Sequence, residues 1–324
     1  MPRIVRIATI AMGGQGGPTV AANRKRMAGL VEQAMAEKPD ILAIPESFTL
    51  AGLAEPRIEE MAEDVPGPTL DMTATFAREH RAYILCPILS RRPDGLHIET
   101  FLLDRSGHIV GSYQKHHPVV EGSAYNRVEF GSRPGSDLPV FDTDFGRIGV
   151  QICFDAEYQD GWEALDHAGA EIIFWLSAYD GGRSISAKAW TYHRFVASAV
   201  QSTYARILNI MGETLAITGS HDPIAACSID LDTGLFHTDF NETQLQAIRA
   251  KYGQEINLHI YHEENYFTLQ SNRADLPVSQ IAEEFKLDPL KMYIQRNQRL
   301  QDALRSGDPL PDLTPPYLGR TQYI

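Results

Sequence analysis

The sequence predicts an α/β protein, because short apolar runs typical of buried strands alternate with segments whose apolar residues recur at helical spacing. The apolar runs lie at 41–44, 147–152 and 171–176. The helical patterns lie at 70–80, 162–168 and 188–201, and an earlier one follows Thr19, a candidate N-cap. This alternation is typical of sheets covered by helices.

Turn and cap residues indicate the remaining elements. We expect strands at 4–12, 83–89 and 204–211, two strands that meet at the turn 104–107, and hairpin strands within 215–230. Beyond Asp239 the pattern becomes helical, and Asp288 and Pro289 are placed to open a last helix as N-cap and first residue. Because no linker stands out, we expect one main domain at 1–253 and an extension at 254–324 that packs on it or on a partner subunit.

The composition is that of a globular chain with an acidic surface. Hydrophobic residues make up 43% and charged residues 22% of the 324 residues, which excludes collagen-like, coiled-coil and disordered classes. The 42 acidic and 29 basic residues leave a formal charge of −13, which repels phosphate backbones and anionic lipid surfaces. We therefore expect a small-molecule partner rather than nucleic acid or a membrane.

Cysteine usage favours a reducing compartment. Cys86, Cys153 and Cys227 are an odd number of scattered cysteines, which does not fit the disulfide framework of a secreted protein. The N-terminal segment alternates charged and apolar residues, so it lacks the apolar core of a signal peptide. No apolar run approaches the roughly 20 residues that span a bilayer. We expect a cytoplasmic location.

Cys153 is the strongest candidate nucleophile. It follows the apolar run 148–152, at the carboxyl end of a predicted strand, where open α/β sheets build their sites. A nucleophile on such a strand-to-turn connection lies beside backbone N–H groups that would bind an oxyanion. A buried structural cysteine is the alternative, and Cys86 and Cys227 keep that interpretation because neither neighbourhood shows a partner base.

Glu46 and Lys115 take the same position relative to their own strands. Glu46 follows the run 41–44 and a proline, and Lys115 ends the strand that precedes His116. Either residue alone would be a solvated surface group. A carboxylate, an amine and a thiol at three strand ends can converge on one edge, which predicts a joint site.

The motifs around these residues resemble the nitrilase superfamily of carbon-nitrogen hydrolases, in its amidase or carbamoylase-like branch. A strand followed by Pro-Glu ends at 46, Tyr-x-Lys-x-His lies at 113–117, and Gly-x-x-x-Cys-x-Asp lies at 149–155, in the family's order. Pro134-Gly135 with the segment 140–143 resembles the family's approach to the cysteine strand. The resemblance covers about residues 3 to 240.

This resemblance implies a four-layer α-β-β-α sandwich with catalytic residues at Glu46, Lys115 and Cys153. An amide carbon is a poor electrophile, so a thiolate is needed, and a lysine cation would stabilise both the thiolate and the later oxyanion. Glu46 would take the thiol proton, return it to the departing amine and then activate water against the thioester.

The resemblance also implies further site residues. A second glutamate is expected a few residues before Pro134, and Glu129 fits that place better than Glu121, although both stay open. The remaining expected residues serve the oxyanion and the substrate: the N–H of Phe154 would complete the oxyanion hole with Lys115, and Tyr125 and Ser177 would line the pocket.

Two segments depart from the family pattern. Tyr-Gln-Asp-Gly at 158–161 stands where the family often has Phe-Pro-Glu, and Trp-Leu-Ser-Ala at 175–178 where a strand often ends in Pro-Ser or Pro-Thr. Both border the pocket, so the substrate is left open. The Phe-Asp pair after the cysteine resembles amidases and carbamoylases, whereas nitrile hydrolysers more often have Trp-Glu.

We therefore expect hydrolysis of a non-peptide amide or N-carbamoyl bond, with release of ammonia or an amine. The alternatives are a nitrilase that converts a nitrile to acid and ammonia, a non-catalytic binding member of the same fold, and a metal-dependent hydrolase.

We expect no cofactor and no metal. His116-His117 and His259-x-x-His262-Glu263-Glu264 lack the His-Glu-x-x-His pattern of zinc hydrolases and are interpreted as polar loop residues. The glycine-rich run 13–17 lacks the Lys-Ser/Thr of a phosphate loop and is interpreted as a turn.

The resemblance further implies a homodimer or a larger homo-oligomer. The predicted helix 188–201, with Trp190, Phe195 and Val196, has the content of an interface, unless it covers the sheet of its own subunit. The extension carries apolar residues that would be poorly soluble if exposed, so we expect it to cross onto the partner; they are Tyr261, Tyr266, Phe267, Met292 and Tyr293.

Overall fold

The structure is a computed structural model that describes residues 2–53, 61–121, 124, 126–239 and 241–311. The chain forms two compact units, Val5–Ile229 and a second unit made of Met1–Ile4 with Asp230–Ile324. The larger unit carries all three motifs. The units divide at Asp230, so the segment 230–253, which we expected in the main domain, belongs to the C-terminal unit.

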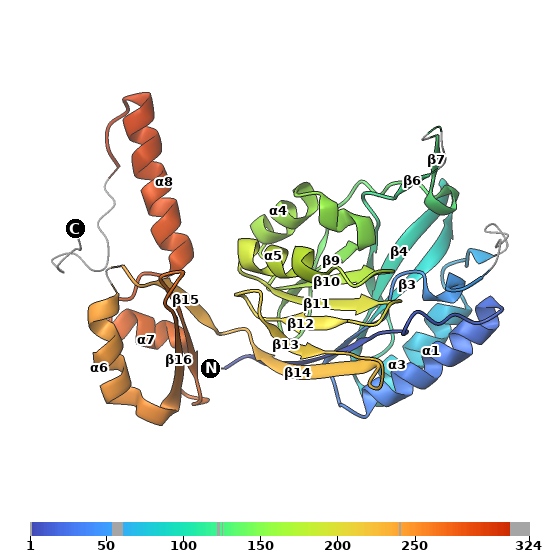
Figure 1. Cartoon of the computed structure of the whole chain (residues 1–324), viewed down its shortest axis with the longest axis horizontal. Helices are drawn as coiled ribbons and strands as arrows, with labels where there is room; N and C mark the ends of the chain where they lie inside the picture. The colour runs from blue at the N-terminus through green and yellow to red at the C-terminus, as the bar shows by residue number, and fades with distance from the viewer. Residues whose placement is uncertain (1, 54–60, 122–123, 125, 240, 312–324) are drawn as a thin grey trace. The chain divides into compact units, whose positions relative to one another are not determined.

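The first sheet of the larger unit has six strands in the order β14-β1-β2-β3-β4-β5 (Figure 1). Their bounds are β1 Ile4–Ile10, β2 Ile41–Ala43, β3 Tyr83–Arg92, β4 Gly95–Leu103, β5 Ile109–Gln114 and β14 Ile224–Asp230. Strands β1, β2 and β3 run parallel, β4 is antiparallel to β3, and β5 is antiparallel to β4. Strand β5 therefore points the same way as β2, so their carboxyl ends lie at the same edge of the sheet.

Helices α1 (Val20–Met35) and α3 (Pro68–His80) cover one face of this sheet. The Oγ of Thr19 accepts a hydrogen bond from the N–H of Ala22, which confirms Thr19 as the N-cap of α1. Proline at the first position of α3 removes one of the N–H groups that have no partner within a helix start. The apolar faces of both helices pack into one core with alternate residues of β1 to β4.

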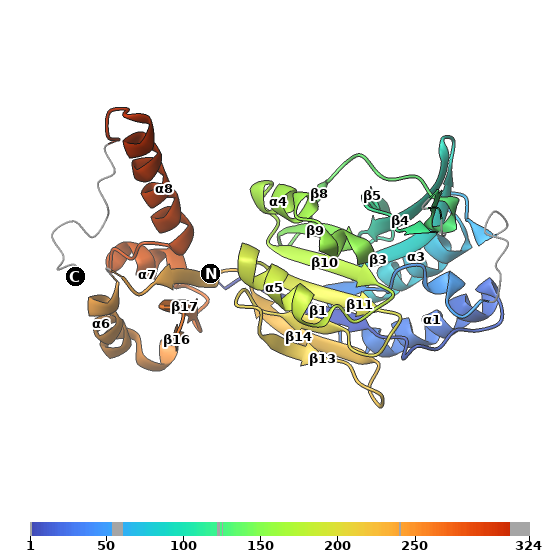
Figure 2. The same ribbon diagram turned by 45° about the horizontal axis from the view of Figure 1, so that its top comes forward.

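The second sheet also has six strands, in the order β13-β12-β11-β10-β9-β8. Their bounds are β8 Val140–Asp142, β9 Arg147–Ile152, β10 Ile172–Ser177, β11 Phe195–Val200, β12 Arg206–Leu208 and β13 Thr214–Ile217. Strands β9, β10 and β11 run parallel. Strand β8 is antiparallel to β9, β12 is antiparallel to β11, and β13 is antiparallel to β12. Helices α4 (Asp160–His167) and α5 (Gly182–Tyr192) cover this sheet through a core built around Trp162, Trp175 and Ile185 (Figure 2).

The two sheets face each other between these pairs of helices. The hydroxyl of Thr9 on β1 donates to the carbonyl of Ser198 on β11, and Ala11 forms a parallel bridge with Val200. Strands β1 and β11 therefore point the same way, and the carboxyl ends of both sheets lie at one end of the unit. This arrangement confirms the four-layer α-β-β-α sandwich.

The predicted helix 188–201 is wrong in its second half. Helix α5 ends at Tyr192, His193 takes a left-handed conformation with φ 49°, and Phe195–Val200 is strand β11. Pairing of every β11 residue with β10 outweighs the helical spacing of the apolar residues. Phe195 and Val196 are buried inside the sheet, so they do not form an interface helix.

The expected hairpin within 215–230 is also wrong. Both strands exist, but β13 lies at the edge of the second sheet, whereas β14 lies at the edge of the first. The segment between them therefore crosses from one sheet to the other. The spacing of apolar residues predicts that each strand exists, but the strand with which it pairs is decided by tertiary packing.

The C-terminal unit is built on a three-stranded antiparallel sheet in the order β15-β17-β16. Its elements are β15 Gly234–His237, α6 Glu242–Tyr252, β16 Ile256–Tyr261, β17 Tyr266–Ser271, α7 Val278–Glu284 and α8 Leu290–Ser306. The predicted helical pattern missed β16 and β17. Ile248 of α6 packs with Phe236 and Leu269 in the core of this unit, which explains why 230–253 belongs to it.

Helix α8 begins one residue later than expected. Its N-cap is Pro289, and Asp288 instead lies buried in an ion pair with Arg296. Phe267 is buried in the unit's own core and so requires no partner, whereas Met292 is 55% exposed. None of the described helices has the length and apolarity needed to cross a membrane.

Candidate active site

The ends of three strands bring a carboxylate, an amine and a thiol together. Glu46 follows β2, Lys115 follows β5, and Cys153 follows β9. The Nζ of Lys115 lies 2.8 Å from the Oε1 of Glu46, and the thiol of Cys153 hydrogen-bonds the same carboxylate. The edge proposed from the sequence therefore gathers these three side chains from both sheets.

Cys153 sits on a strained turn. Its φ of 48° lies in the left-handed region, which costs a non-glycine residue about 1–3 kcal/mol. The indole N–H of Trp175 donates to the Cys153 carbonyl at 2.9 Å, and the chain continues into a short 3-10 turn, η3 (Cys153–Glu157). The first N–H groups of a helical turn have no partner within it, and Phe154, the expected oxyanion donor, is the second residue of this turn.

The surroundings of Cys153 favour the neutral thiol over the thiolate. Burial raises the pKa of Cys153 to about 12, the carboxylate of Glu46 adds to this rise, and Lys115 opposes it. The Ser177 hydroxyl and the Ala178 N–H also hydrogen-bond the sulfur and favour the thiolate. Lys115 alone therefore does not ionise the thiol, and attack on a substrate requires a base.

Glu46 is placed to be that base. Burial raises the pKa of the Glu46 carboxyl, the nearby Glu129 raises it further, and Lys115 lowers it. Burial also opposes the charge of Lys115, but the negative groups around its amine keep the pKa of Lys115 above its ordinary value. The site thus contains a cationic lysine beside a carboxyl with increased proton affinity.

Glu129 lies on the other side of Lys115. Its Oε1 is 2.5 Å from the Nζ of Lys115 and accepts the N–H of Val119 at 2.9 Å. Glu129 begins the 3-10 turn η2 (Glu129–Gly131), which follows the short strands β6 (Val120–Glu121) and β7 (Arg127–Val128). Glu121 forms a separate, exposed ion pair with Arg127 at 3.2 Å. The structure thus brings Glu129, rather than Glu121, to the lysine.

Gly135 supports the backbone of this lysine. Its N–H donates to the Lys115 carbonyl at 2.9 Å. A Cβ at position 135 would lie 2.4 Å from the carbonyl oxygen of Gln114, so the close approach requires glycine. This contact gives a physical reason for the Pro-Gly pair in the motif.

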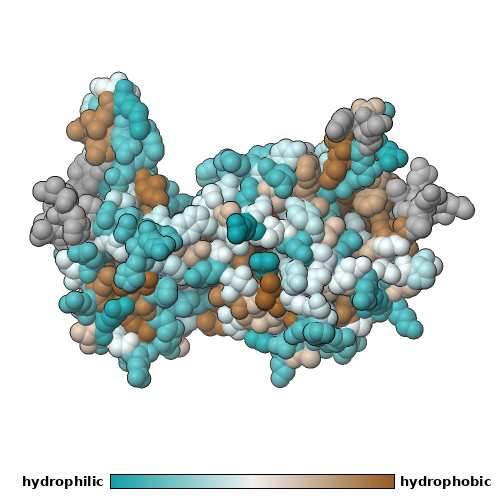
Figure 3. All heavy atoms as spheres, in the orientation of Figure 1, coloured by the Kyte–Doolittle hydropathy of each residue, from teal (hydrophilic) through white to brown (hydrophobic). Residues whose placement is uncertain are grey.

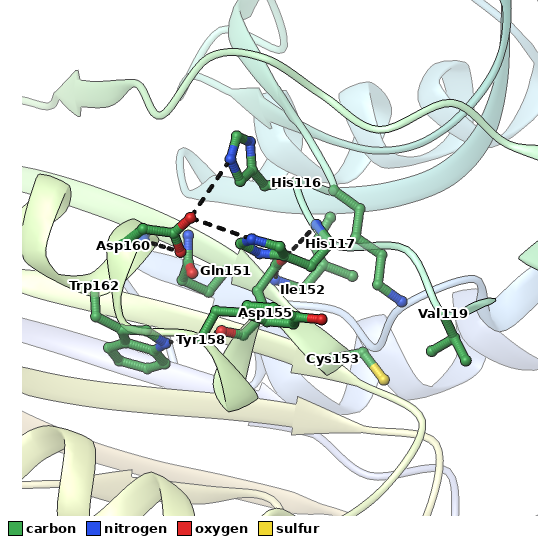
Figure 4. A network of polar contacts seen from close by, with 12 residues as sticks. His116, His117, Val119, Gln151, Ile152, Cys153, Asp155, Tyr158, Asp160 and Trp162 are labelled. Carbon is green, nitrogen blue, oxygen red and sulfur yellow. Dashed lines mark hydrogen bonds and ion pairs between the residues drawn. The ribbon is translucent and has the colours of Figure 1, made fainter. Parts of the chain in front are cut away.

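A network around Asp155 connects the lysine segment to the cysteine turn (Figure 4). Its Oδ2 accepts from the Tyr113 hydroxyl at 2.7 Å and from the Ile152 N–H at 2.8 Å. Its Oδ1 accepts from the His117 N–H at 2.7 Å and faces the His117 ring Nδ1 at 3.3 Å. Asp155 is fully buried, and the residues that contact its carboxylate lie within two residues of Lys115 or Cys153.

The remaining predicted residues have different outcomes. Ser177, at the end of β10, contacts the Cys153 sulfur, as described above. Phe154 is half-buried, and its ring meets the edge of Tyr158 with centroids 5.7 Å apart. Tyr125 lies outside the described residues.

Sequence reasoning missed Gln201 and Tyr179, which also follow strands of the second sheet. The side chain of Gln201 donates to the backbone carbonyl of Glu46 at 2.6 Å. Burial raises the pKa of Tyr179 to about 12, and the charges of Cys153 and Glu157 add to this effect, so its phenol lies within electrostatic reach of the nucleophile. The logic of strand ends that identified the other residues would have found both.

One group of described side chains has the spacing of metal ligands. Ligand atoms of His116, His117 and Asp160 lie within 4.8 Å of one another. However, the His117 ring already faces Asp155 through Nδ1 and Asp160 through Nε2, at 3.3 and 3.2 Å. The three side chains therefore form an ion-pair network around Asp160. His259 and His262 do not form such a group within the described part of the chain.

The two facing sheets and the cysteine-centred site at their carboxyl ends define an α-β-β-α sandwich with a buried thiol, carboxylate and amine. The chain belongs to the carbon-nitrogen hydrolase family, whose sequence model matches residues 6–232. This match confirms the relationship that the three motifs indicated.

Curated relatives support the same family. A beta-ureidopropionase of Arabidopsis thaliana is 27% identical over 65% of this chain and 54% of its own length. An omega-amidase of Xenopus tropicalis is 22% identical over 66% of this chain and 85% of its own. A bifunctional nitrilase/nitrile hydratase of Nicotiana tabacum is 34% identical over 29% of this chain and 26% of its own. The chain thus spans about half of the first relative and about a quarter of the third.

Solved structures show the same fold. A nitrilase-superfamily member of Saccharomyces cerevisiae matches with a TM-score of 0.60 and 16% identity, over 77% of this chain and 94% of its own. An amidase of Nesterenkonia matches with a TM-score of 0.58 and 18% identity, over 70% of this chain and 90% of its own.

Proposed function

We propose that this protein hydrolyses the carbon–nitrogen bond of a non-peptide amide or N-carbamoyl compound through a thioester on Cys153. The observation that carries the proposal is the contact of one carboxylate, Glu46, with both the thiol of Cys153 and the amine of Lys115. The names of the beta-ureidopropionase and omega-amidase relatives support the substrate class.

The first half of the reaction forms the thioester. As the sulfur attacks the carbonyl carbon, Glu46 takes the thiol proton, which is needed because the thiol is neutral at rest. The carbonyl oxygen becomes an oxyanion that accepts from the Lys115 amine and the Phe154 N–H, each donor contributing about 3–4 kcal/mol. Glu46 then returns the proton to the departing nitrogen, and ammonia or an amine leaves as the carbon–nitrogen bond breaks.

The second half regenerates the enzyme. Glu46 takes a proton from water, and the resulting hydroxide attacks the thioester carbon through a second oxyanion. The carbon–sulfur bond breaks, the acid is released, and Cys153 regains the proton from Glu46. Glu129 holds the lysine amine between two carboxylates throughout, so Lys115 keeps its charge and its place.

A nitrilase is the second candidate function. The observation that favours it is the 34% identity to the Nicotiana tabacum nitrilase/nitrile hydratase, although that match spans 29% of this chain. The sulfur of Cys153 would attack the nitrile carbon, and Glu46 would again take the thiol proton. A test of ammonia release across amides, carbamoyl amino acids, carbamoyl amines and nitriles distinguishes the candidates. No turnover of any class would favour a non-catalytic binding member of the fold.

We further propose a homodimer or larger assembly in the cytoplasm. The three cysteines are all free, as a reducing compartment requires. Helix α8 carries four exposed large apolar side chains, Met292, Ile294, Leu300 and Leu304. Figure 3 shows brown, hydrophobic surface in the region of this helix. A second copy would cover them. Light scattering that gave a mass near 36.1 kDa, or a truncation before Asp288 that left the assembly unchanged, would contradict this.

A further inference from the structure

We propose that Asp155 is a positioning residue that holds the amine of Lys115 in a fixed position relative to the sulfur of Cys153. The inference rests on the proposed thioester chemistry. The carboxylate of Asp155 contacts Tyr113, His117 and Ile152 rather than the reactive groups of Lys115 or Cys153, so its effect on the reaction would pass through Lys115.

The four contacts of the Asp155 carboxylate involve residues that flank the two reactive residues. Tyr113 and His117 lie two residues before and two residues after Lys115, and both donate to the Asp155 carboxylate. The Ile152 N–H, directly before Cys153, donates to the same carboxylate, and Asp155 itself lies two residues after the nucleophile. One carboxylate therefore connects the Tyr113 side chain and the His117 backbone, on either side of the lysine, to the backbone next to the cysteine.

The burial of Asp155 makes this connection stiff. A fully buried carboxylate is tolerated only when its oxygens are hydrogen-bonded, and each oxygen here has two contacts. Loss of one donor would leave a buried charge undercompensated, so the geometry resists displacement. Burial and the adjacent Asp155 charge raise the pKa of Tyr113, so its hydroxyl remains a donor.

Two further contacts fix the His117 ring, as Figure 4 shows. Its Nε2 lies 3.2 Å from Asp160, at the start of α4. The ring of Tyr158 stacks on it with centroids 3.7 Å apart and planes 3° from parallel. The segment that carries Lys115 is thus held by Asp155 on the cysteine turn and by Asp160 on the following helix.

Such a connection matters because oxyanion donors act over short distances. A donor contributes fully only at about 2.7–3.1 Å from the oxyanion, and a misplacement of about 1 Å costs roughly a hundredfold in rate. Lys115 comes from the first sheet and Cys153 from the second. Without a direct connection, their separation would depend on the packing between the two sheets.

The first test is Asp155→Asn, which keeps the shape but replaces one acceptor oxygen with a donor amide. We expect kcat to fall about a hundredfold while KM changes less than about threefold, because ground-state binding is unaffected. The matched control is Glu99→Gln. Glu99 is a fully buried carboxylate bonded to Ser90, Arg92 and Ser112 and is not part of the site, so its loss should lower stability but leave kcat unchanged.

The second test is a double-mutant cycle with Lys115→Ala. The readout is the rate at which iodoacetamide alkylates Cys153, measured by mass spectrometry of the modified peptide, so no substrate is needed. We expect Asp155→Asn to slow alkylation in the wild-type background and to have no further effect once Lys115 is alanine. Equal effects in both backgrounds would overturn the positioning role, as would a wild-type kcat for Asp155→Asn.

Tyr113→Phe is the fallback if Asp155→Asn does not fold. It removes one donor to Asp155 while keeping the ring, and we expect about a tenfold loss of kcat that disappears in the Lys115→Ala background. An unchanged kcat would overturn the role. A wild-type protein that turns over no amide, carbamoyl compound or nitrile would instead refute the proposed function, and the alkylation cycle would still decide the positioning.

Discussion

The Nζ of Lys115 lies 2.8 Å from the Oε1 of Glu46, and the exposed fractions of the two side chains are 0% and 5%. A buried ion pair of this kind is costly to desolvate and is weak evidence for stability. This ion pair lies beside a neutral thiol, so the carboxylate can exchange a proton with the sulfur while the amine remains charged. The pair is therefore explained by a role in the reaction.

Glu46→Gln should lower kcat by several orders of magnitude with little change in KM. The amide cannot accept the thiol proton, so the loss occurs in the transition state rather than in ground-state binding. Steady-state kinetics on the best substrate measures both constants, and circular dichroism checks the fold. A change confined to KM would refute the role of Glu46 as base.

Lys115→Ala should lower both turnover and stability. Loss of an oxyanion donor costs about 10²–10³ in kcat, and removal of the cation leaves the carboxylates of Glu46 and Glu129 buried together. Removing one member of a buried ion pair lowers the free energy of unfolding by about 3–5 kcal/mol. Urea unfolding of the variant and the wild type measures this loss. This loss of stability should become smaller as the pH falls. Burial raises the pKa of Glu46, so the carboxylate gains a proton and no longer repels Glu129. A variant as stable as the wild type at neutral pH would contradict the pairing.

Glu129→Gln tests which second glutamate acts at the lysine. We expect a large loss of kcat, because Glu129 contacts the Lys115 amine directly. Glu121→Gln is the matched control, since Glu121 forms an exposed pair with Arg127 and should keep wild-type kinetics. Wild-type rates for Glu129→Gln together with a loss for Glu121→Gln would reverse the assignment.

The strand ends that carry Glu46, Lys115 and Cys153 could be predicted because each follows an apolar run whose period and length are local properties. The contact of Glu129 with Lys115 could be anticipated only as one of two choices, since it depends on how the loop folds. Strand β11 was mistaken for a helix because its partner β10 is distant in sequence and only pairing with it decides the conformation. The proposed role of Asp155 could not be predicted either, because two of its donors, Tyr113 and His117, flank Lys115 at the end of a strand in the other sheet.

His117 makes stability dependent on pH. The hydrogen bond to Asp155 raises the pKa of His117, although burial opposes it, and the charges of Asp155 and Asp160 raise it further. The folded state therefore favours the imidazolium, which stabilises the fold fully below the ordinary pKa of about 6.5 and loses this contribution as the pH rises through the raised value. The Tm difference between wild type and His117→Gln should thus be largest near pH 5 and shrink above it. A difference that grew with pH would contradict this sign.

Cys86→Ala and Cys227→Ala are the controls for the nucleophile. Cys86 is fully buried in the core under α1 and α3, and burial raises its pKa to about 12. Cys227 is half-buried on β14, and burial raises its pKa as well. Neither residue is part of the site described above, so both variants should retain nearly full turnover.

The most direct test of the account is ammonia or amine release by wild type and Cys153→Ala, measured on the same set of amides, carbamoyl compounds and nitriles. We predict that wild type turns over at least one amide or carbamoyl compound and that Cys153→Ala, still folded by circular dichroism, turns over none, because every covalent step requires the sulfur. Substantial residual turnover by Cys153→Ala would contradict the thioester mechanism.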